Sequence, residues 1–191
     1  MAELHIYDFD GTLFRSPTPP ADWSGTTGQW FVSEESLGEP YVPEKPGTEF
    51  WVESTVAQAR FSIADPNVWA IIVTGRPKHK GGFSYRVPEL VHNKGLRFDD
   101  IYLSPGGDTA AFKKMVIKKM LDRYPAIDTV HFWEDRPDDL RQYVQFAKNL
   151  GKLMVPHLVR AESGQAVART NSLAEMAERV VRRQEAGTIQ P

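Results

Sequence analysis

Short apolar runs rich in β-branched and aromatic residues alternate along the chain with longer segments whose apolar positions recur every three to four residues. The first pattern is typical of buried strands and the second of helices. The expected strands cover residues 4–9, 68–73, 101–103, 130–133 and 153–159, and the expected helices cover 53–63, 88–94, 112–124 and 140–150. This alternation predicts an α/β fold, a doubly wound, Rossmann-like parallel sheet of about five strands flanked by helices.

Two segments depart from this alternation. Residues 15–52 are rich in proline and contain Trp23, Trp30 and Trp51, so we expect a loop or small cap inserted after the first strand. Near the carboxyl end, the Ser-Leu-Ala-Glu sequence that starts at Ser172 has the form of a capping box and predicts a helix over 172–186. Because 191 residues suit one main core, a single domain over 1–191 is expected.

Composition narrows the functional classes. With a formal net charge of -2, the chain has no overall basic field, so a nucleic-acid partner would need a local basic patch. The absence of cysteine excludes disulfides, thiolate metal sites and cysteine nucleophiles. The first residues lack the pattern of a signal peptide, and the longest apolar run, 68–73, is far shorter than the roughly 20 residues of a membrane span. We therefore expect a cytoplasmic protein with no membrane partner, and the sequence leaves its oligomeric state open.

A pair of carboxylates follows the first expected strand. Asp8 and Asp10 are one residue apart, and positions i and i+2 of an extended chain share a face. Their mutual repulsion favours a cation such as Mg²⁺, which prefers oxygen ligands. Asp8 could then attack phosphorus to give an aspartyl-phosphate, while Asp10 protonates the leaving oxygen and later activates water. An EF-hand calcium loop does not fit, because Thr12 and Pro19 occupy positions that need ligands.

Three further strand ends carry polar groups, and parallel strands bring such ends to one edge of the sheet. Thr74, Gly75 and Arg76 follow the second strand and suit a phosphoryl oxygen, with a simple surface turn as the alternative. After the third strand, a helix opens with Thr109 as its expected cap and Lys113 in its first turns. Lysine is electrostatically disfavoured there, which favours a phosphate-facing role for Lys113, with Lys114 as the reserve candidate.

The fourth strand ends in an acidic cluster. Asp135 is the natural second metal carboxylate, while Glu134 or Asp139 could bind the metal directly or through water. Helix capping is the alternative explanation for these acidic residues. The five histidines show no metal-ligand spacing, and no catalytic role is assigned to them.

The order of these strand-end groups resembles that of the haloacid dehalogenase-like (HAD) superfamily, whose pattern is an Asp-x-Asp-x-Thr loop, a strand-end Thr or Ser, a Lys and an acidic pair. The resemblance implies a Mg²⁺-dependent phosphatase of HAD fold. By that resemblance, Asp8 is the nucleophile, Asp10 the acid/base and, through its backbone, a metal ligand, Thr74 and Lys113 the phosphate holders, and Asp135 a metal ligand, with Glu134 as a further candidate. Thr12, Gly75, Arg76, Lys78 and Arg136 are the remaining candidate phosphate or substrate contacts.

A finer resemblance is to the polynucleotide-phosphatase branch, including the phosphatase half of phage polynucleotide kinase and the HAD domain of Swiss Army Knife RNA repair proteins. It rests on the segments 13–17, 65–67, 95–99, 109–113 and 134–136. No Gly-x4-Gly-Lys-Ser/Thr loop occurs in the sequence, so we expect no kinase half within it. Where that branch often has a His after Glu-Asp-Arg, this chain has Asp139. The resemblance implies removal of a terminal phosphate from RNA or DNA and leaves 3′ versus 5′ preference open.

Residues 76–97 give this substrate class independent support, because basic residues outnumber acidic ones there. These basic residues are Arg76, Lys78, Lys80, Arg86, Lys94 and Arg97. Aromatic residues of the insertion, such as Trp23, Trp30 and Phe31, could stack a base, although a small core of the insertion is the favoured explanation for them. A nucleotide or small-metabolite phosphatase is the nearest alternative, and a catalytically silent scaffold on the same fold is a third.

Overall fold

The computed structural model describes residues 2–79 and 82–160, which lie within one compact unit, and contains the expected parallel sheet of five strands in the order β3-β2-β1-β4-β5. The strands are β1 (Ala2–Tyr7), β2 (Val68–Pro77), β3 (Asp100–Ser104), β4 (Ile127–Glu134) and β5 (Leu153–Leu158). The helices are α1 (Thr27–Phe31), α2 (Glu53–Ala64), α3 (Phe83–Asn93), α4 (Thr109–Arg123) and α5 (Pro137–Asn149), with 3₁₀ turns η1 (Glu34–Leu37) and η2 (Thr48–Phe50). The α/β prediction is confirmed.

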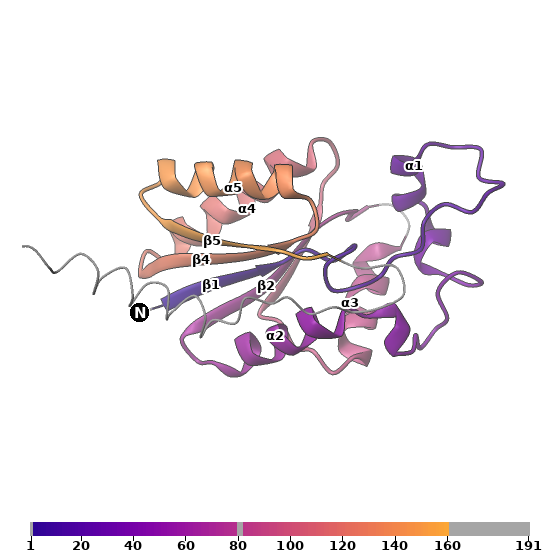
Figure 1. Ribbon diagram of the computed structural model, residues 1–191, viewed down its shortest axis with the longest axis horizontal. Helices are drawn as coiled ribbons and strands as arrows, with labels where there is room; N and C mark the ends of the chain where they lie inside the picture. The colour runs from indigo at the N-terminus through magenta and orange to yellow at the C-terminus, as the bar shows by residue number, and fades with distance from the viewer. Residues whose placement is uncertain (1, 80–81, 161–191) are drawn as a thin grey trace, which may run out of the picture. The chain divides into compact units, whose positions relative to one another are not determined.

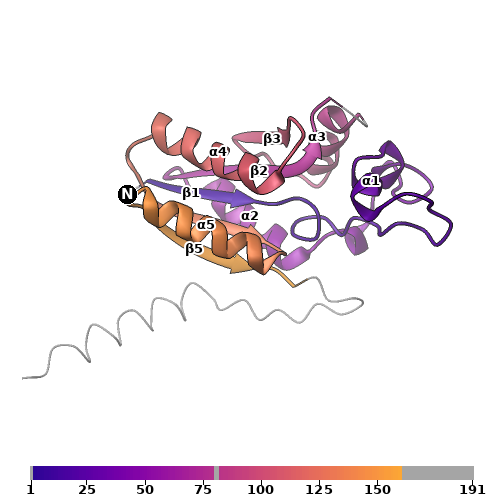
Figure 2. The ribbon, with the colours of Figure 1, turned by 90° about the horizontal axis from the view of Figure 1, so that it is seen from above.

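Helices cover both faces of the sheet (Figure 1). Helices α4 and α5 lie side by side on one face, as Figure 2 shows from above, and α2 and α3 pack on the other. Alternation along β1 explains this double layer: Leu4 and Ile6 join the core under α4 and α5, whereas Tyr7 joins the core of the opposite face. β1 is central, with Ile6 in register with Ile71 of β2 and Phe132 of β4.

Three helix starts differ from the expectation: α5 begins at Pro137, three residues before its expected start at 140. Helix α3 begins at Phe83, five residues before the predicted start, and Pro88 lies inside it, at the cost of one helical hydrogen bond. Helix α4 begins at Thr109 because Asp108, not Thr109, is its cap: the Asp108 carboxylate accepts from the backbone N–H groups of the next helical residues at 2.8 and 3.3 Å.

The insertion over 15–52 lies beyond the carboxyl ends of the strands (Figure 1). Trp30 is fully buried there, its Nε1 donates to the Pro17 carbonyl at 2.7 Å, and the rings of Trp23 and Tyr41 pack edge-on against it. Trp30 therefore belongs to the insertion's own small core, which leaves its surface to the partly exposed Trp23 and Phe31.

The helix expected over 172–186 lies outside the described residues. None of the helices over 2–79 and 82–160 combines the length and the apolar character needed to traverse a lipid bilayer.

Candidate functional site

Three charged side chains converge at the carboxyl edge of the sheet. Tyr7 of β1 is in register with Trp133 of β4, so the residues that follow them, Asp8 and Glu134, lie next to each other. Lys113 reaches both from α4: its Nζ is 2.7 Å from Asp8 Oδ1 and 2.6 Å from Glu134 Oε2. All three side chains are buried, so the ammonium group is held between two carboxylates away from solvent.

Burial sets the electrostatics of this cluster. Burial first, and then the Glu134 carboxylate, raise the pKa of Asp8 well above its ordinary range, against the pull of Lys113. Burial and Glu134 likewise raise the pKa of Asp135 to about 7. Burial would lower the pKa of Lys113, but Asp8 and Glu134 outweigh it and raise that pKa. Two carboxylates thus share the Lys113 ammonium and a third, Asp135, lies beside them, an arrangement that a further cation would stabilise.

These carboxylates fit a divalent cation. Asp8, Glu134 and Asp135 each offer an oxygen, and the three oxygens lie within 4.8 Å of one another. The loop after β1 passes so close to them that a Cβ added at Gly11 would lie 2.4 Å from Asp135 Oδ2. Gly11 also has a positive φ of +71°. Only glycine allows this backbone approach without strain. A set made entirely of oxygen ligands is what Mg²⁺ prefers.

The Asp10 side chain is paired with Arg76. The Arg76 Nε donates to both Asp10 oxygens at 3.1 Å, and Nη2 donates to Asp10 Oδ1 at 2.7 Å. Arg76 Nη1 donates to the Phe31 carbonyl at 2.8 Å and to the Ser36 hydroxyl, and the side chain is only 1% exposed. The guanidinium predicted to bind substrate is therefore held by acceptors of the protein, and it links the loop after β1 to the insertion.

The hydroxyl groups predicted at the site are buried. Thr74 Oγ1 accepts from the Arg76 backbone N–H at 3.2 Å. Thr12 Oγ1 is a buried hydroxyl without a hydrogen-bond partner in the described part of the chain. Gly75 lets the amino end of α4 approach β2, because a Cβ there would lie 3.0 Å from Thr109 Cγ2.

Other predicted residues lie at the rim or away from the site. Arg136 is half-exposed and pairs with Asp139 at 3.0 Å. Lys78 is exposed. Of the two candidate lysines, Lys113 reaches Asp8, whereas Lys114 donates to Gln142 at 3.3 Å on the surface.

The predicted basic segment over 76–97 forms mostly intramolecular contacts. Arg86 donates to carbonyls of the insertion, those of Leu37 and Pro43, at 2.9 and 2.8 Å. Lys94 pairs with Glu53, and Arg97 donates to backbone carbonyls. Lys80 lies outside the described residues. The basic residues of this segment are therefore largely engaged within the protein: apart from Lys78, the cations of this segment that the structure describes bind the protein's own acceptors.

Comparison with known proteins identifies the family of the chain. Residues 21–188 match the model of HAD domain family 1 in Swiss Army Knife RNA repair proteins, a range that begins after Asp8 and Asp10. An uncharacterized protein of Saccharomyces cerevisiae, YMR265C, is 24% identical over an alignment of 177 residues, and the match covers 78% of this chain and 38% of the yeast protein. The HAD domain of the Legionella pneumophila effector Lem4 shares the fold at a TM-score of 0.50 and 12% identity, over 98% of this chain and 97% of that domain. The chain, a HAD-like protein by fold, therefore belongs to HAD domain family 1 of the Swiss Army Knife RNA repair proteins.

Proposed function

We propose that this HAD domain is a Mg²⁺-dependent phosphatase that works through an aspartyl-phosphate on Asp8. The observation that carries the proposal is the buried contact of Lys113 with both Asp8 and Glu134 at the carboxyl edge of the sheet. A buried nucleophile needs a fixed cation beside it to accept a dianionic group, and Lys113 provides one.

In the proposed reaction, an Asp8 carboxylate oxygen attacks phosphorus and the bond from phosphorus to the leaving oxygen breaks. Asp10 gives a proton to that oxygen. Water then attacks the aspartyl-phosphate, Asp10 takes the water's proton, and inorganic phosphate leaves as the Asp8 carboxylate is restored. Thr74 and Lys113 hold the phosphoryl oxygens during both steps.

Asp8 and Asp135 would hold the metal, and Glu134 would bind it directly or through water. Mg²⁺ bound there supplies positive charge that favours ionised Asp8 and offsets the charge of the phosphoryl group. Glu134 also fixes Lys113, because its Oε2 accepts from the Lys113 ammonium. Asp10 must exchange part of its contact with Arg76 for the leaving oxygen before it can act as an acid.

For the substrate we propose a terminal phosphate on a polynucleotide. The family description, a domain of RNA repair proteins, supports this class. The insertion supports it as well, because Trp23 and Phe31 are partly exposed on it and could stack a base. Its regular elements are a five-residue helix and two 3₁₀ turns. Exposed Lys78 and half-exposed Arg136 are the cations proposed to meet the phosphate chain.

One observation favours a second candidate, a nucleotide or small phosphomonoester. Arg86, Lys94 and Arg97 bind acceptors of the protein itself, which leaves fewer cations for a phosphate chain. A substrate that presents one phosphate would need only the central cluster.

The two candidates are separated by an assay of purified protein with Mg²⁺ on oligonucleotides with a 3′ or a 5′ phosphate, mononucleotides and an aryl phosphate, with Asp8→Asn as the control. The proposal expects faster release from one type of oligonucleotide end, falling steeply as salt rises because several phosphates are contacted. Release from mononucleotides or the aryl ester alone would select the small substrate. If no substrate is hydrolysed, the domain is a scaffold on the HAD fold.

A further inference from the structure

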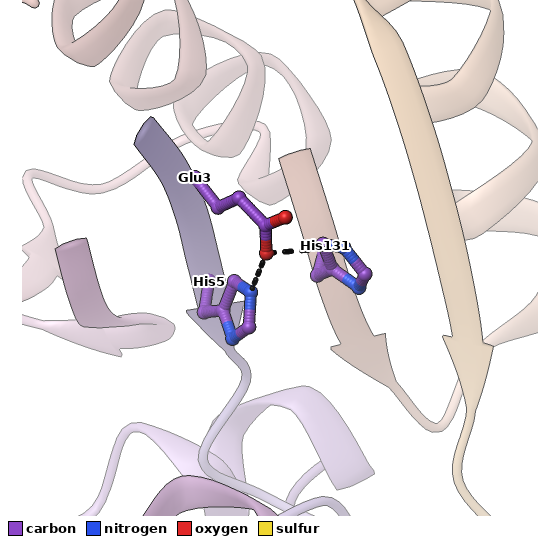
Figure 3. Close-up of side chains that lie close together, drawn as sticks. All are labelled: Glu3, His5 and His131. Atoms are coloured by element: carbon purple, nitrogen blue, oxygen red, sulfur yellow. Dashed lines mark hydrogen bonds and ion pairs between the residues drawn. The ribbon is translucent and has the colours of Figure 1, made fainter. Parts of the chain in front are cut away.

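Three side chains on β1 and β4 point their polar atoms at one place, well away from the carboxyl edge. His5 and His131 are register partners on these neighbouring strands, and Glu3 lies two residues before His5 on the same face (Figure 3). The Nε2 atom of His5 is 2.9 Å from Glu3 Oε2, and the Nε2 atom of His131 is 3.6 Å from the same oxygen. Two imidazoles and one carboxylate therefore converge on a common point.

We propose that Glu3, His5 and His131 form a binding site for Zn²⁺ or a similar first-row transition-metal ion. Zn²⁺ takes imidazole nitrogen and carboxylate oxygen at about 2.0–2.2 Å in a tetrahedral arrangement. Neighbouring ligand atoms of such a tetrahedron lie about 3.3–3.5 Å apart. The separations of 2.9 and 3.6 Å fall on either side of that range, and all three ligand atoms lie within 4.8 Å of one another.

The far ring nitrogens of both histidines already have partners of the kind that orient metal ligands. His5 Nδ1 is 2.7 Å from Ser62 Oγ, and His131 Nδ1 is 2.9 Å from His157 Nε2. When His5 Nε2 binds an ion, the ring proton sits on Nδ1 and is donated to Ser62. The Ser62 hydroxyl then donates to the Gln58 carbonyl, 3.1 Å away, so the hydrogen bonds on the Ser62 side of the ring are kept, while the contact of His5 Nε2 with Glu3 is replaced by the bonds of both groups to the ion.

Burial also favours the ion-binding state of the rings. The two histidine side chains are less than 10% exposed, whereas the Glu3 side chain is 39% exposed, which leaves a solvent-facing side for a water as fourth ligand. Burial, together with repulsion from His5, lowers the pKa of His131 to about 4, and burial lowers the pKa of His5 against the opposing pull of Glu3. Both rings are therefore neutral at physiological pH, as a metal ligand must be.

The site is separate from the candidate active site. His5 precedes Asp8 by three residues, about 10 Å along an extended chain. An ion bound there would cross-link β1 to β4, the strands that position Asp8 and Glu134. The inference does not depend on the proposed phosphatase activity, because it concerns binding alone.

The test is a titration of the metal-stripped full chain with Zn²⁺ against a chromogenic chelator, with millimolar Mg²⁺ present to occupy the acidic cluster. We expect one Zn²⁺ per chain with a Kd of about 1 µM or tighter. His131→Gln should weaken it by at least about 100-fold and Glu3→Gln by at least about 10-fold. His92→Gln, which removes an exposed histidine of α3, and Asp135→Asn, which alters the acidic cluster, should leave it unchanged.

Failure to bind Zn²⁺ at micromolar concentration would overturn the proposal. So would wild-type affinity in both His131→Gln and Glu3→Gln, or loss of the ion in Asp135→Asn. If His131→Gln does not fold, Glu3→Gln decides the matter, because its carboxylate is the most exposed of the three ligands. Co²⁺ in place of Zn²⁺ adds a second readout: intense visible absorption bands in the wild type that Glu3→Gln weakens support the site, and their persistence at full intensity contradicts it.

Discussion

The guanidinium of Arg76 faces the carboxylate of Asp10, with Nη2 2.7 Å from Oδ1, and the same side chain reaches the insertion through Phe31 and Ser36. One buried arginine at the end of β2 thus holds both the loop after β1 and the segment beyond the strands. The position of Asp10 and the placement of the insertion are coupled through this contact.

Replacing Arg76 should therefore affect stability and catalysis together. Arg76→Met leaves the Asp10 carboxylate without its cation, and we expect a loss of about 3 kcal/mol in the free energy of unfolding, with a lower kcat. Arg97→Met is the matched control, because Arg97 is exposed and donates to two backbone carbonyls; it should change stability by no more than about 0.5 kcal/mol. Urea unfolding and steady-state kinetics measure both effects, and equal stability of the two variants would refute the coupling.

Lys113 and Lys114 form a natural pair of test positions. Lys113→Met leaves Asp8 and Glu134 buried and repelling each other, so we expect loss of activity and destabilisation by about 3–5 kcal/mol at pH 8. Lowering the pH should reduce this deficit because the carboxylates then take up protons. Lys114→Met, on the exposed side of α4, should be near neutral. The idea fails if both variants retain wild-type turnover.

The three neighbouring histidines His5, His131 and His157 predict a pH dependence of stability. Burial first, and then His131 and His5, lower the pKa of His157 to about 3, against 6.5 for an unperturbed histidine. Between these values the unfolded chain binds a proton that the folded chain does not, so the contribution to stability is complete above pH 6.5 and is lost as the pH falls. One such group adds a slope of at most about 1.4 kcal/mol per pH unit.

The measurement compares free energies of unfolding between pH 4.5 and 7 for the wild type and His157→Gln. The raised pKa of Asp135 acts with the opposite sign in this range, so the quantity that matters is the difference in slope between proteins that share Asp135. His157→Gln should have the shallower rise, and His92→Gln should match the wild type. Identical slopes for all three proteins would show that His157 does not titrate as the structure implies.

The sequence predicted the sheet because its strands are short apolar runs whose identity does not depend on partners far along the chain. It also predicted that polar groups would gather at one edge, since parallel strands end together: Asp8, Thr74 and Glu134 lie at or just after the ends of β1, β2 and β4. The predicted start of α3 was wrong, because proline is typical of the first turn of a helix and Pro88 therefore predicts a start there. In the structure, the buried side chains of Phe83, Val87 and Leu90 stabilise a helix that begins five residues earlier.

What the sequence could not predict are pairings set by tertiary register. Arg76 lies in a segment rich in basic residues, and nothing local distinguishes it from Lys78; only the turn after β1 brings Asp10 to it. His5 and His131 are 126 positions apart, so spacing rules for metal ligands within one segment do not detect them. A signal did exist, because both histidines stand at the third position before the strand-end acidic residues Asp8 and Glu134 of neighbouring strands.

The central claim, an aspartyl-phosphate on Asp8, is tested most directly by trapping it. Protein mixed with Mg²⁺ and the fastest substrate, carrying a radioactive phosphate, is quenched in acid within one turnover. The account predicts label on the peptide that contains Asp8, and hydroxylamine should release that label. Asp8→Asn should carry no label, and its activity should be at least about 1,000-fold lower than that of the wild type. Phosphate release by Asp8→Asn at the wild-type rate, or label on another residue, would contradict it.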